Sequence, residues 1–165
     1  MSDQKVIRIL FVCTGNICRS PSAEGLFLHK VAQAGLSDRI KVDSAGTHDF
    51  HVGDAPDPRA QEAARRRGYD LSKLRGRQVI RRDFLEFDYV LAMDQQNLKS
   101  LKPICPPQQG HKLKLLMEFA PDAEDLEIPD PFQGSEEDFD AVLDRLEAAA
   151  EGLLAHLREE LETGD

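Results

Sequence analysis

Long apolar runs are missing from this chain of 165 residues. None approaches the roughly 18 apolar residues that a membrane-spanning helix needs. Residues 1–5 also lack the charge pattern and length of a signal peptide. These absences argue against membrane association and export. We find no internal repeats and no low-complexity tract, so the length predicts a single domain over residues 1–165.

Cysteine is scarce, with only 3 residues at positions that show no framework spacing. An odd number of cysteines argues against a disulfide scaffold and favours a reducing compartment, so we expect the protein in the cytoplasm. Zinc sites usually show a Cys-x2-Cys pair followed by a second pair, whereas Cys13 and Cys18 are followed only by Cys105. The sequence therefore predicts no metal site and no cofactor.

An overall excess of positive charge is absent too, because the formal net charge is -9. This charge argues against nucleic acid as a partner. The charge is divided unevenly, however: residues 1–82 hold 15 Lys and Arg against 9 Asp and Glu, and residues 83–165 hold 6 against 21. The basic half either neutralises the acidic half across the folded surface or contains a local anion site.

Apolar, β-branched segments alternate with helical patterns along the chain. Strands are expected over residues 6–12, 40–44, 87–93 and 112–116. Helices are expected over about residues 21–34, 58–67, 94–101 and 139–161, whereas the proline-containing stretch 120–134 is expected to be a loop. This alternation predicts an α/β fold, a doubly wound three-layer α/β/α sandwich around a central four-stranded parallel sheet. Ligands bind such sheets at the carboxyl ends of the strands.

The loop at residues 13–20, with the sequence Cys-Thr-Gly-Asn-Ile-Cys-Arg-Ser, lies between the first predicted strand and the first predicted helix. Backbone N–H groups and the helix dipole favour an anion at such a place. The same field, together with Arg19, stabilises the thiolate form of Cys13. The planar guanidinium of Arg19 matches two oxygens of a phosphate group. The loop therefore combines an anion site with a candidate nucleophile.

Three further residues of this loop have types that suit such a site. Gly15 permits unusual backbone angles and Asn16 tolerates a left-handed one, so the loop amides can point inward. Ser20 can donate a hydrogen bond to the Cys13 sulfur when that sulfur is a leaving group. A nucleotide-binding P-loop would need a second Gly and a Lys that are absent here. A purely structural role for the cysteines remains an alternative.

At this point the sequence resembles the low-molecular-weight protein tyrosine phosphatase family, whose signature Val-Cys-x-Gly-Asn-x-Cys-Arg-Ser-Pro stands at residues 12–21. The resemblance covers nearly the whole chain. Further family-like segments lie at residues 43–47, 57–60, 87–94 and 130–132.

The resemblance implies a catalytic role for three residues. Cys13 would take the phosphoryl group, Arg19 and the loop amides would hold its oxygens, and Asp130 would protonate the leaving phenolate and then act as a base. The loop residues that would form the phosphate-binding site with them are Thr14, Gly15, Asn16, Ile17, Cys18 and Ser20.

The residues around Asp130 favour the same role. Pro129 and Pro131 restrict the backbone there, and Pro131 favours an extended conformation of Asp130 itself, which suits an acid held in a fixed place. From the residues alone, Asp122 and Asp125 are rival candidates for the acid.

The resemblance also implies supporting roles. Phe50 and Phe132 would form apolar walls for an aromatic ring. Cys18 would be a redox partner that forms a reversible disulfide with Cys13 and protects it from overoxidation. Ser44 and Asn16 would hold the shape of the loop through hydrogen bonds.

The sequence departs from the family pattern in two segments, one after Ser72 and one at Asp130. After Ser72 the family commonly has a His two residues on and then an Ala-Arg pair, whereas here Leu74 and Gly76-Arg77 stand at these positions. Leu74 cannot supply the hydrogen bond that this His gives to Asn16. The loop at Asp130 also lacks the tyrosines typical of the family, so regulation by their phosphorylation is not available.

We therefore expect metal-independent hydrolysis of phosphotyrosine in proteins and of small aryl phosphates, by a monomer or a weakly self-associating protein. Two alternative activities belong to the same fold. Phosphoarginine phosphatases tend to carry Thr at the position of Ile17, so Ile17 argues against the first. Arsenate reductases need two more redox cysteines, and only Cys105 is left, which argues against the second. A non-catalytic phosphate-binding module and a thiol redox sensor using Cys13 and Cys18 are the alternatives of a different class.

Overall fold

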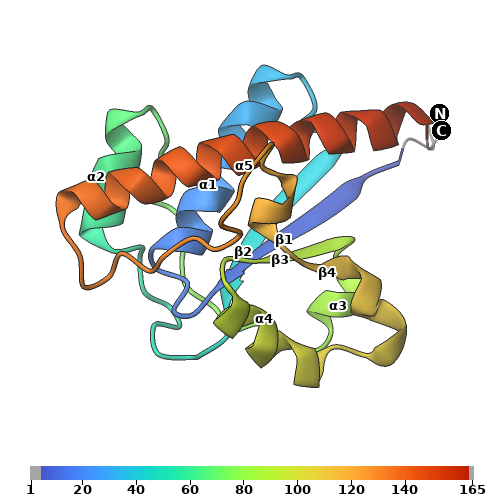
Figure 1. The fold of residues 1–165 in the computed structure, drawn as a ribbon, viewed down its shortest axis with the longest axis horizontal. Coiled ribbons are helices and arrows are strands. Elements are labelled where there is room, and N and C mark those ends of the chain that lie inside the picture. Colours follow the sequence, from blue (N-terminus) through green and yellow to red (C-terminus); the bar gives the residue numbers. More distant parts are fainter. Residues whose placement is uncertain (1–4, 164–165) are drawn as a thin grey trace.

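The computed structural model describes residues 5–163, which form a four-stranded parallel sheet with helices on both faces (Figure 1). The strands, in the spatial order β2-β1-β3-β4, are β1 (Ile7–Cys13), β2 (Ile40–Gly46), β3 (Tyr89–Ala92) and β4 (Leu113–Leu115). The helices are α1 (Arg19–Gln33), α2 (Pro58–Arg66), α3 (Asp83–Glu86), α4 (Gln95–Leu101) and α5 (Glu136–Thr163), with short 3₁₀ helices at Lys102–Ile104, Pro107–Lys112 and Leu116–Phe119. The predicted doubly wound α/β fold is confirmed.

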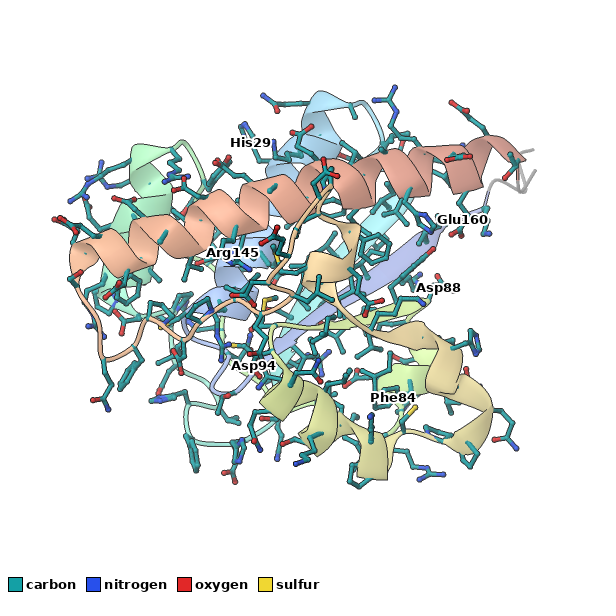
Figure 2. The ribbon with its side chains drawn as sticks, in the orientation of Figure 1. His29, Phe84, Asp88, Asp94, Arg145 and Glu160 are labelled. Atoms are coloured by element: carbon teal, nitrogen blue, oxygen red, sulfur yellow. The ribbon has the colours of Figure 1, made fainter. Side chains whose placement is uncertain are left out.

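Strand β1 explains why two helical layers are needed. Its alternate side chains point to opposite faces of the sheet, so Ile9 and Phe11 pack with α1, α2 and α5, while Leu10 and Val12 pack on the other side with Phe84. Figure 2 shows Phe84 on the side of α3 and α4, away from α5. A strand that is buried on both faces reads as a nearly continuous apolar run, and residues 6–12 show this pattern except at Arg8, which is exposed.

The predicted boundaries differ from the observed ones where a few residues make a local turn. Helix α1 begins at Arg19, two residues before the predicted start, so Arg19 and Ser20 lie in its first turn. Strand β3 ends at Ala92 because Asp94 already caps α4, with its Oδ1 accepting from the Asn97 N–H at 2.8 Å. The one-turn helix α3 was not predicted, because four residues are too few to show a helical period.

The parallel register brings three strand ends to one edge of the sheet. Cys13 pairs with Gly46 at the end of β2, and Val12 pairs with Ala92 at the end of β3. The backbone after β1 passes very close to β2 here, since a Cβ atom on Gly46 would lie 2.8 Å from the carbonyl oxygen of Thr14. This edge is where a doubly wound sheet binds its ligands.

Helix α5 is the longest helix of the structure and packs across α1, α2 and the 3₁₀ helix Leu116–Phe119 (Figure 1). Its apolar residues repeat at helical spacing and face the core, as the sequence predicted. Within residues 5–163, no helix has both the length and the apolar character needed to cross a membrane.

Gly152, in the middle of α5, allows this close packing. A Cβ atom at Gly152 would lie 1.7 Å from the carbonyl oxygen of Phe119, which is fixed main chain. We therefore expect Gly152→Ala to lower the free energy of unfolding by about 1–3 kcal/mol, because the helix must move away from its neighbour. Urea denaturation would measure the change, with Glu159→Ala on the exposed face of the same helix as the control. A gain in stability, which helix propensity alone predicts, would contradict this account.

Candidate active site

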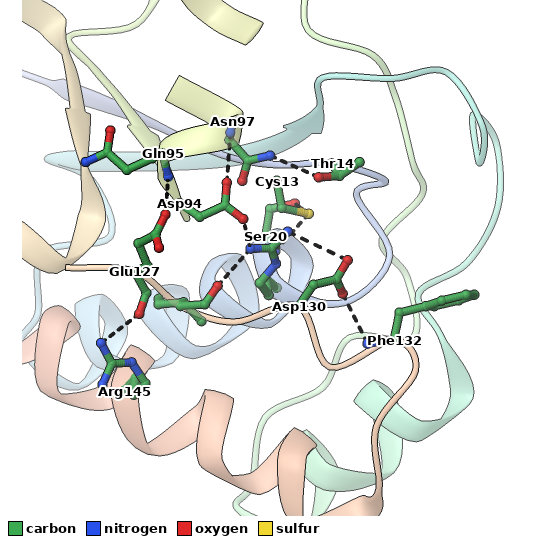
Figure 3. Close-up of polar contacts among 12 residues, drawn as sticks. Cys13, Thr14, Ser20, Asp94, Gln95, Asn97, Glu127, Asp130, Phe132 and Arg145 are labelled. Carbon is green, nitrogen blue, oxygen red and sulfur yellow. Dashed lines mark hydrogen bonds and ion pairs between the residues drawn. The ribbon is translucent and has the colours of Figure 1, made fainter. Parts of the chain in front are cut away.

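The loop at residues 13–20, which we call the Cys13 loop, curls around the sulfur of its first residue (Figure 3). Three donors surround the Cys13 Sγ: the Asn16 N–H at 3.3 Å, the Ser20 N–H at 3.5 Å and the Ser20 hydroxyl at 2.9 Å. The N-terminus of α1 points at the same place, because α1 begins at Arg19. Hydrogen-bond donors and a helix N-terminus in this arrangement stabilise negative charge at the place they point to.

Asn16 sets the direction of the hydrogen bonds behind the sulfur. It adopts the left-handed backbone (φ 57°) that the sequence analysis allowed for, and its Oδ1 accepts from the Arg77 N–H at 3.0 Å. Its Nδ2 is therefore free to donate to Ser20 Oγ at 2.8 Å and to Ser44 Oγ at 3.0 Å. Because Ser20 accepts from Asn16 and lies closer to Cys13 Sγ (2.9 Å) than to the Ala45 carbonyl (3.5 Å), its proton is directed to the sulfur.

The hydrogen-bond donor to the Asn16 side chain, which could not be assigned from the sequence, is the backbone N–H of Arg77. Leu74 packs against the apolar core, so its side chain takes no part in this polar network. Gly76 makes the approach of Arg77 possible, since a Cβ atom there would lie 2.4 Å from the carbonyl oxygen of His51. The support for Asn16 thus comes from a backbone donor that directly follows Gly76, one of the positions where this sequence departs from the family pattern.

Glu24 lies behind Ser44 and was not identified from the sequence. The Ser44 hydroxyl donates to Glu24 Oε1 at 2.6 Å, and the Glu24 side chain is buried on α1. Burial, assisted by the nearby carboxylate of Asp43, raises the pKa of Glu24 to about 7, against the opposing effects of Ser44 and Arg77. The signal that could have found Glu24 is its place one helical turn after Ser20, on the side of α1 that faces the sheet.

The raised pKa of Glu24 predicts a dependence of stability on pH. Between its ordinary pKa and about 7, the folded protein binds a proton that the unfolded chain has released, so stability falls as pH rises through this window. We expect Glu24→Gln, which resembles the protonated acid, to gain about 2 kcal/mol in unfolding free energy over wild type between pH 5 and pH 8. Urea denaturation of both proteins at the two pH values measures this gain. A difference that stays constant with pH would contradict it.

Arg19 is almost fully buried, with a side chain that is 2% exposed. Its Nη1 donates to Asp94 Oδ2 at 2.7 Å and to the Ile128 carbonyl at 2.8 Å. Its Nη2 lies 3.9 Å from Asp130 Oδ2. Two acceptors therefore fix one side of the guanidinium, and the other side is directed at the Cys13 loop and Asp130.

Helix α4 holds the Cys13 loop from the side of β3. Its N-cap Asp94 binds both Arg19 and the Asn97 N–H, and Asn97 Nδ2 donates to Thr14 Oγ1 at 3.0 Å. Neither Asp94 nor Asn97 was identified as a site residue from the sequence. Asp94 could have been found as a polar residue that follows a buried strand at the carboxyl edge of the sheet.

Asp130 reaches the site from the loop at residues 120–134, which we call the Asp130 loop. Ile128 anchors this loop through its N–H, which donates to the Met93 carbonyl at 2.8 Å. Asp130 Oδ1 accepts from the Phe132 N–H at 3.1 Å, and the side chain is 50% exposed. The rival acids Asp122 and Asp125 do not line the pocket above Cys13, whereas Asp130 does.

The pocket above Cys13 has a volume of about 160 Å³. It brings together most of the predicted site residues and one further residue, His51. The lining residues are Cys13, Thr14, Gly15, Ile17, Cys18, Arg19, Phe50, His51, Asp130 and Phe132. Asn16, Ser20 and Ser44 do not line the pocket and act through the hydrogen bonds described above. Phe50 stacks on His48 with ring centroids 4.9 Å apart and is 67% exposed, so this wall of the pocket is open to solvent.

Cys18 is the N-cap residue of α1 and is buried. Burial, and then the negative charges of Asp57, Cys13 and Asp130, raise the pKa of its thiol well above the ordinary value. Cys18 therefore keeps its proton at neutral pH.

Comparison with known proteins gives consistent matches over almost the whole chain. The family model described as low molecular weight phosphotyrosine protein phosphatase matches residues 8–163. A low molecular weight protein-tyrosine-phosphatase of Streptomyces coelicolor is 40% identical over 158 residues, which cover 94% of this chain and 96% of that protein. The human low molecular weight phosphotyrosine protein phosphatase is 40% identical over 144 residues, covering 86% and 90%. The crystal structure of YfkJ from Bacillus subtilis has a TM-score of 0.90 at 37% identity, covering 96% and 99%.

Proposed function

Because the chain belongs to the low molecular weight phosphotyrosine protein phosphatase family, we propose that it hydrolyses phosphotyrosine in proteins and small aryl phosphates through a phosphocysteine intermediate on Cys13. The observation that carries this proposal is the arrangement around the Cys13 sulfur. Three hydrogen-bond donors surround that sulfur at the base of a pocket, and Arg19 and Asp130 lie at the same pocket. A nucleophile, an oxyanion-binding group and an acid are thus present together.

In the first step, the Cys13 thiolate attacks phosphorus and the bond to the phenol oxygen breaks. Arg19 and the amides of the Cys13 loop hold the non-bridging oxygens, whose charge must be stabilised in the transition state. Asp130 gives its proton to the departing phenol oxygen, so the products are a free phenol and the phosphocysteine.

In the second step, water attacks the phosphocysteine and Asp130, now ionised, takes its proton. The bond from sulfur to phosphorus breaks, and inorganic phosphate and the Cys13 thiolate are released. The Ser20 hydroxyl, whose proton is directed at the sulfur, favours this departure because it stabilises the negative charge that returns to Cys13. No step in this sequence requires a metal ion.

The walls of the pocket support an aromatic substrate. Phe50 and Phe132 line the pocket with apolar rings, and Ile17 adds an aliphatic surface where related phosphoarginine phosphatases tend to carry Thr. A flat phenyl ring gains contact area between such groups. These residues therefore favour aryl phosphates over phosphoarginine.

Cys18 is proposed as the redox partner of Cys13. A peroxide would oxidise the Cys13 thiolate to a sulfenic acid and would itself be reduced to water or an alcohol. Attack of the Cys18 sulfur would then form a disulfide, with the Cys18 thiol proton and the sulfenic hydroxyl group leaving together as water. A thiol reductant would restore both cysteines. Both are free in this structure, and Cys18 lines the same pocket as Cys13.

The proposed function is tested by steady-state hydrolysis under reducing conditions with EDTA. Wild-type protein should release phosphate from p-nitrophenyl phosphate and from phosphotyrosine peptides, and much more slowly from phosphoserine and phosphoarginine peptides. Rapid acid quenching during turnover should trap phosphate on Cys13, identified by mass spectrometry. Vanadate binding without any turnover would instead indicate a phosphate-binding module, and a Cys13–Cys18 disulfide without any turnover would indicate a redox sensor.

A further inference from the structure

Arg59, in the first turn of α2, contacts the Asp130 loop although 73 residues separate it from Phe132. Its Nη2 donates to the Phe132 carbonyl at 2.8 Å. The same guanidinium makes a two-point contact with Asp57, from Nε at 3.1 Å and from Nη2 at 2.9 Å. This paired geometry fixes the plane of the guanidinium, which a lysine could not do.

The aromatic rings of Phe132 and Phe139 hold the same guanidinium. Its central carbon lies 5.5 Å from the centre of the Phe132 ring and 4.7 Å from that of Phe139. Both distances are within the range of a cation–π interaction. Phe139 is buried in the core from α5, so Arg59 joins the pocket wall Phe132 to a fixed part of the fold.

Asp57 connects this contact to the Cys13 loop. Its backbone N–H donates to the Ile17 carbonyl at 2.8 Å, and its side chain caps α2 by accepting from the Arg59 N–H at 2.8 Å. A continuous path therefore runs from Ile17 through Asp57 and Arg59 to Phe132. It joins the loop that carries the nucleophile to the loop that carries the acid.

Phe132 is the residue that holds the carboxylate of Asp130. Its N–H donates to Asp130 Oδ1, and its carbonyl accepts from Arg59. Two residues before Asp130, Ile128 is held by the Met93 carbonyl and by Arg19. The acid thus lies between two anchors, one at the end of β3 and the other at Arg59.

We propose that Arg59 is a positioning residue that fixes Phe132 and, through it, the carboxylate of Asp130 above Cys13. The inference rests on the proposed function, in which Asp130 protonates the leaving group. It predicts that loss of Arg59 harms the proton transfer more than the binding of phosphate, because the groups that bind phosphate keep their own support from Asp94, Asn97 and Asn16.

The test is a double-mutant cycle between Arg59→Met and Asp130→Asn, followed with two substrates. Phenyl phosphate has a poor leaving group that needs a proton, and 2-chloro-4-nitrophenyl phosphate has a good one that does not. We expect Arg59→Met to lower kcat/KM for phenyl phosphate by about 10- to 100-fold and for the activated ester by much less. In the Asp130→Asn background, Arg59→Met should lower kcat/KM for phenyl phosphate by less than about threefold.

Three controls make the outcomes distinct. Arg65→Met removes an exposed arginine of the same helix, which pairs with Glu62, and should leave both rates unchanged. Arg59→Lys keeps the charge without the planar fork and should restore only part of the rate. Inhibition by vanadate should be unchanged in Arg59→Met, because vanadate reports the state of the Cys13 loop.

Losses that are equal for both substrates, equal in both backgrounds, or accompanied by weaker vanadate inhibition would overturn the role of Arg59 and show a structural effect alone. If Asp130→Asn by itself lowers kcat/KM equally for both substrates, the acid role of Asp130 in the proposed function fails, and this inference fails with it. If Asp130→Asn is selective for phenyl phosphate and Arg59→Met is not, the inference about Arg59 alone is overturned.

Discussion

Cys13→Ser should abolish hydrolysis of aryl phosphates, with kcat lowered by at least about 10⁴-fold. The donors around position 13 stabilise a thiolate, but a serine hydroxyl stays protonated at neutral pH and is a far weaker nucleophile. Serine also forms a bond to phosphorus that the second step cannot readily break, because an alkoxide is a poorer leaving group than a thiolate. Hydrolysis of p-nitrophenyl phosphate under reducing conditions measures the effect.

Cys105→Ser is the matched control, since Cys105 is half-buried and does not line the pocket. It should keep wild-type activity. The Cys13→Ser protein should still bind vanadate or phosphate, because Arg19 and the loop amides are unchanged. Substantial turnover by the Cys13→Ser protein would exclude the phosphocysteine intermediate and leave a different nucleophile to be found.

Asp130→Asn should lower kcat/KM for phenyl phosphate by about 10²- to 10⁴-fold, the usual contribution of a positioned general acid. Asparagine is chosen because its Oδ1 can still accept from the Phe132 N–H, so the Asp130 loop keeps its shape and only the transferable proton is lost. The loss should shrink as the leaving group improves, since a good leaving group departs without a proton. A series of substituted phenyl phosphates measures this dependence.

Asp122→Asn is the control for this prediction. Asp122 lies in the same loop but outside the pocket, and its positive φ of 58° is one that asparagine also tolerates. The activity of the Asp122→Asn protein should equal that of wild type. If Asp122→Asn were as slow as Asp130→Asn, the effect would come from the loop as a whole and the acid would not be Asp130.

The parts of the site that could be predicted from the sequence are those made within a few residues of chain. The Cys13 loop is such a part, because its strand, its tight turn and the start of α1 all lie between residues 7 and 33. Its donors reach Cys13 Sγ from residues three and seven positions away. The left-handed backbone of Asn16 and the predicted place of an anion site follow from residue type and position alone.

The contacts that hold this loop in place could not be predicted in the same way. Arg19 meets Asp94 across 75 positions, Asn16 meets the Arg77 N–H across 61, and Arg59 meets Phe132 across 73. No local pattern encodes such pairs, because their closeness depends on the order of the strands in the sheet and on the paths of the connecting loops. The hydrogen bond from the main chain of Arg77 to Asn16 leaves even less signal in the sequence, since every residue except proline carries that N–H.

Gly152 and Glu24 show the same division within single helices. A glycine inside a long helix, such as Gly152, usually lowers the stability of that helix. A glutamate in an amphipathic helix, such as Glu24, usually faces solvent. In the folded protein the Phe119 carbonyl lies against Gly152, and Glu24 is buried behind Ser44, so neither residue has the environment that is usual for its type in a helix. The sequence by itself determined the α/β class, the Cys13 loop as the candidate site and Asp130 as the candidate acid, since these depend on local pattern and residue chemistry. The tertiary structure alone decided which distant groups fix their geometry, because packing is what brings those groups within a few ångströms of each other.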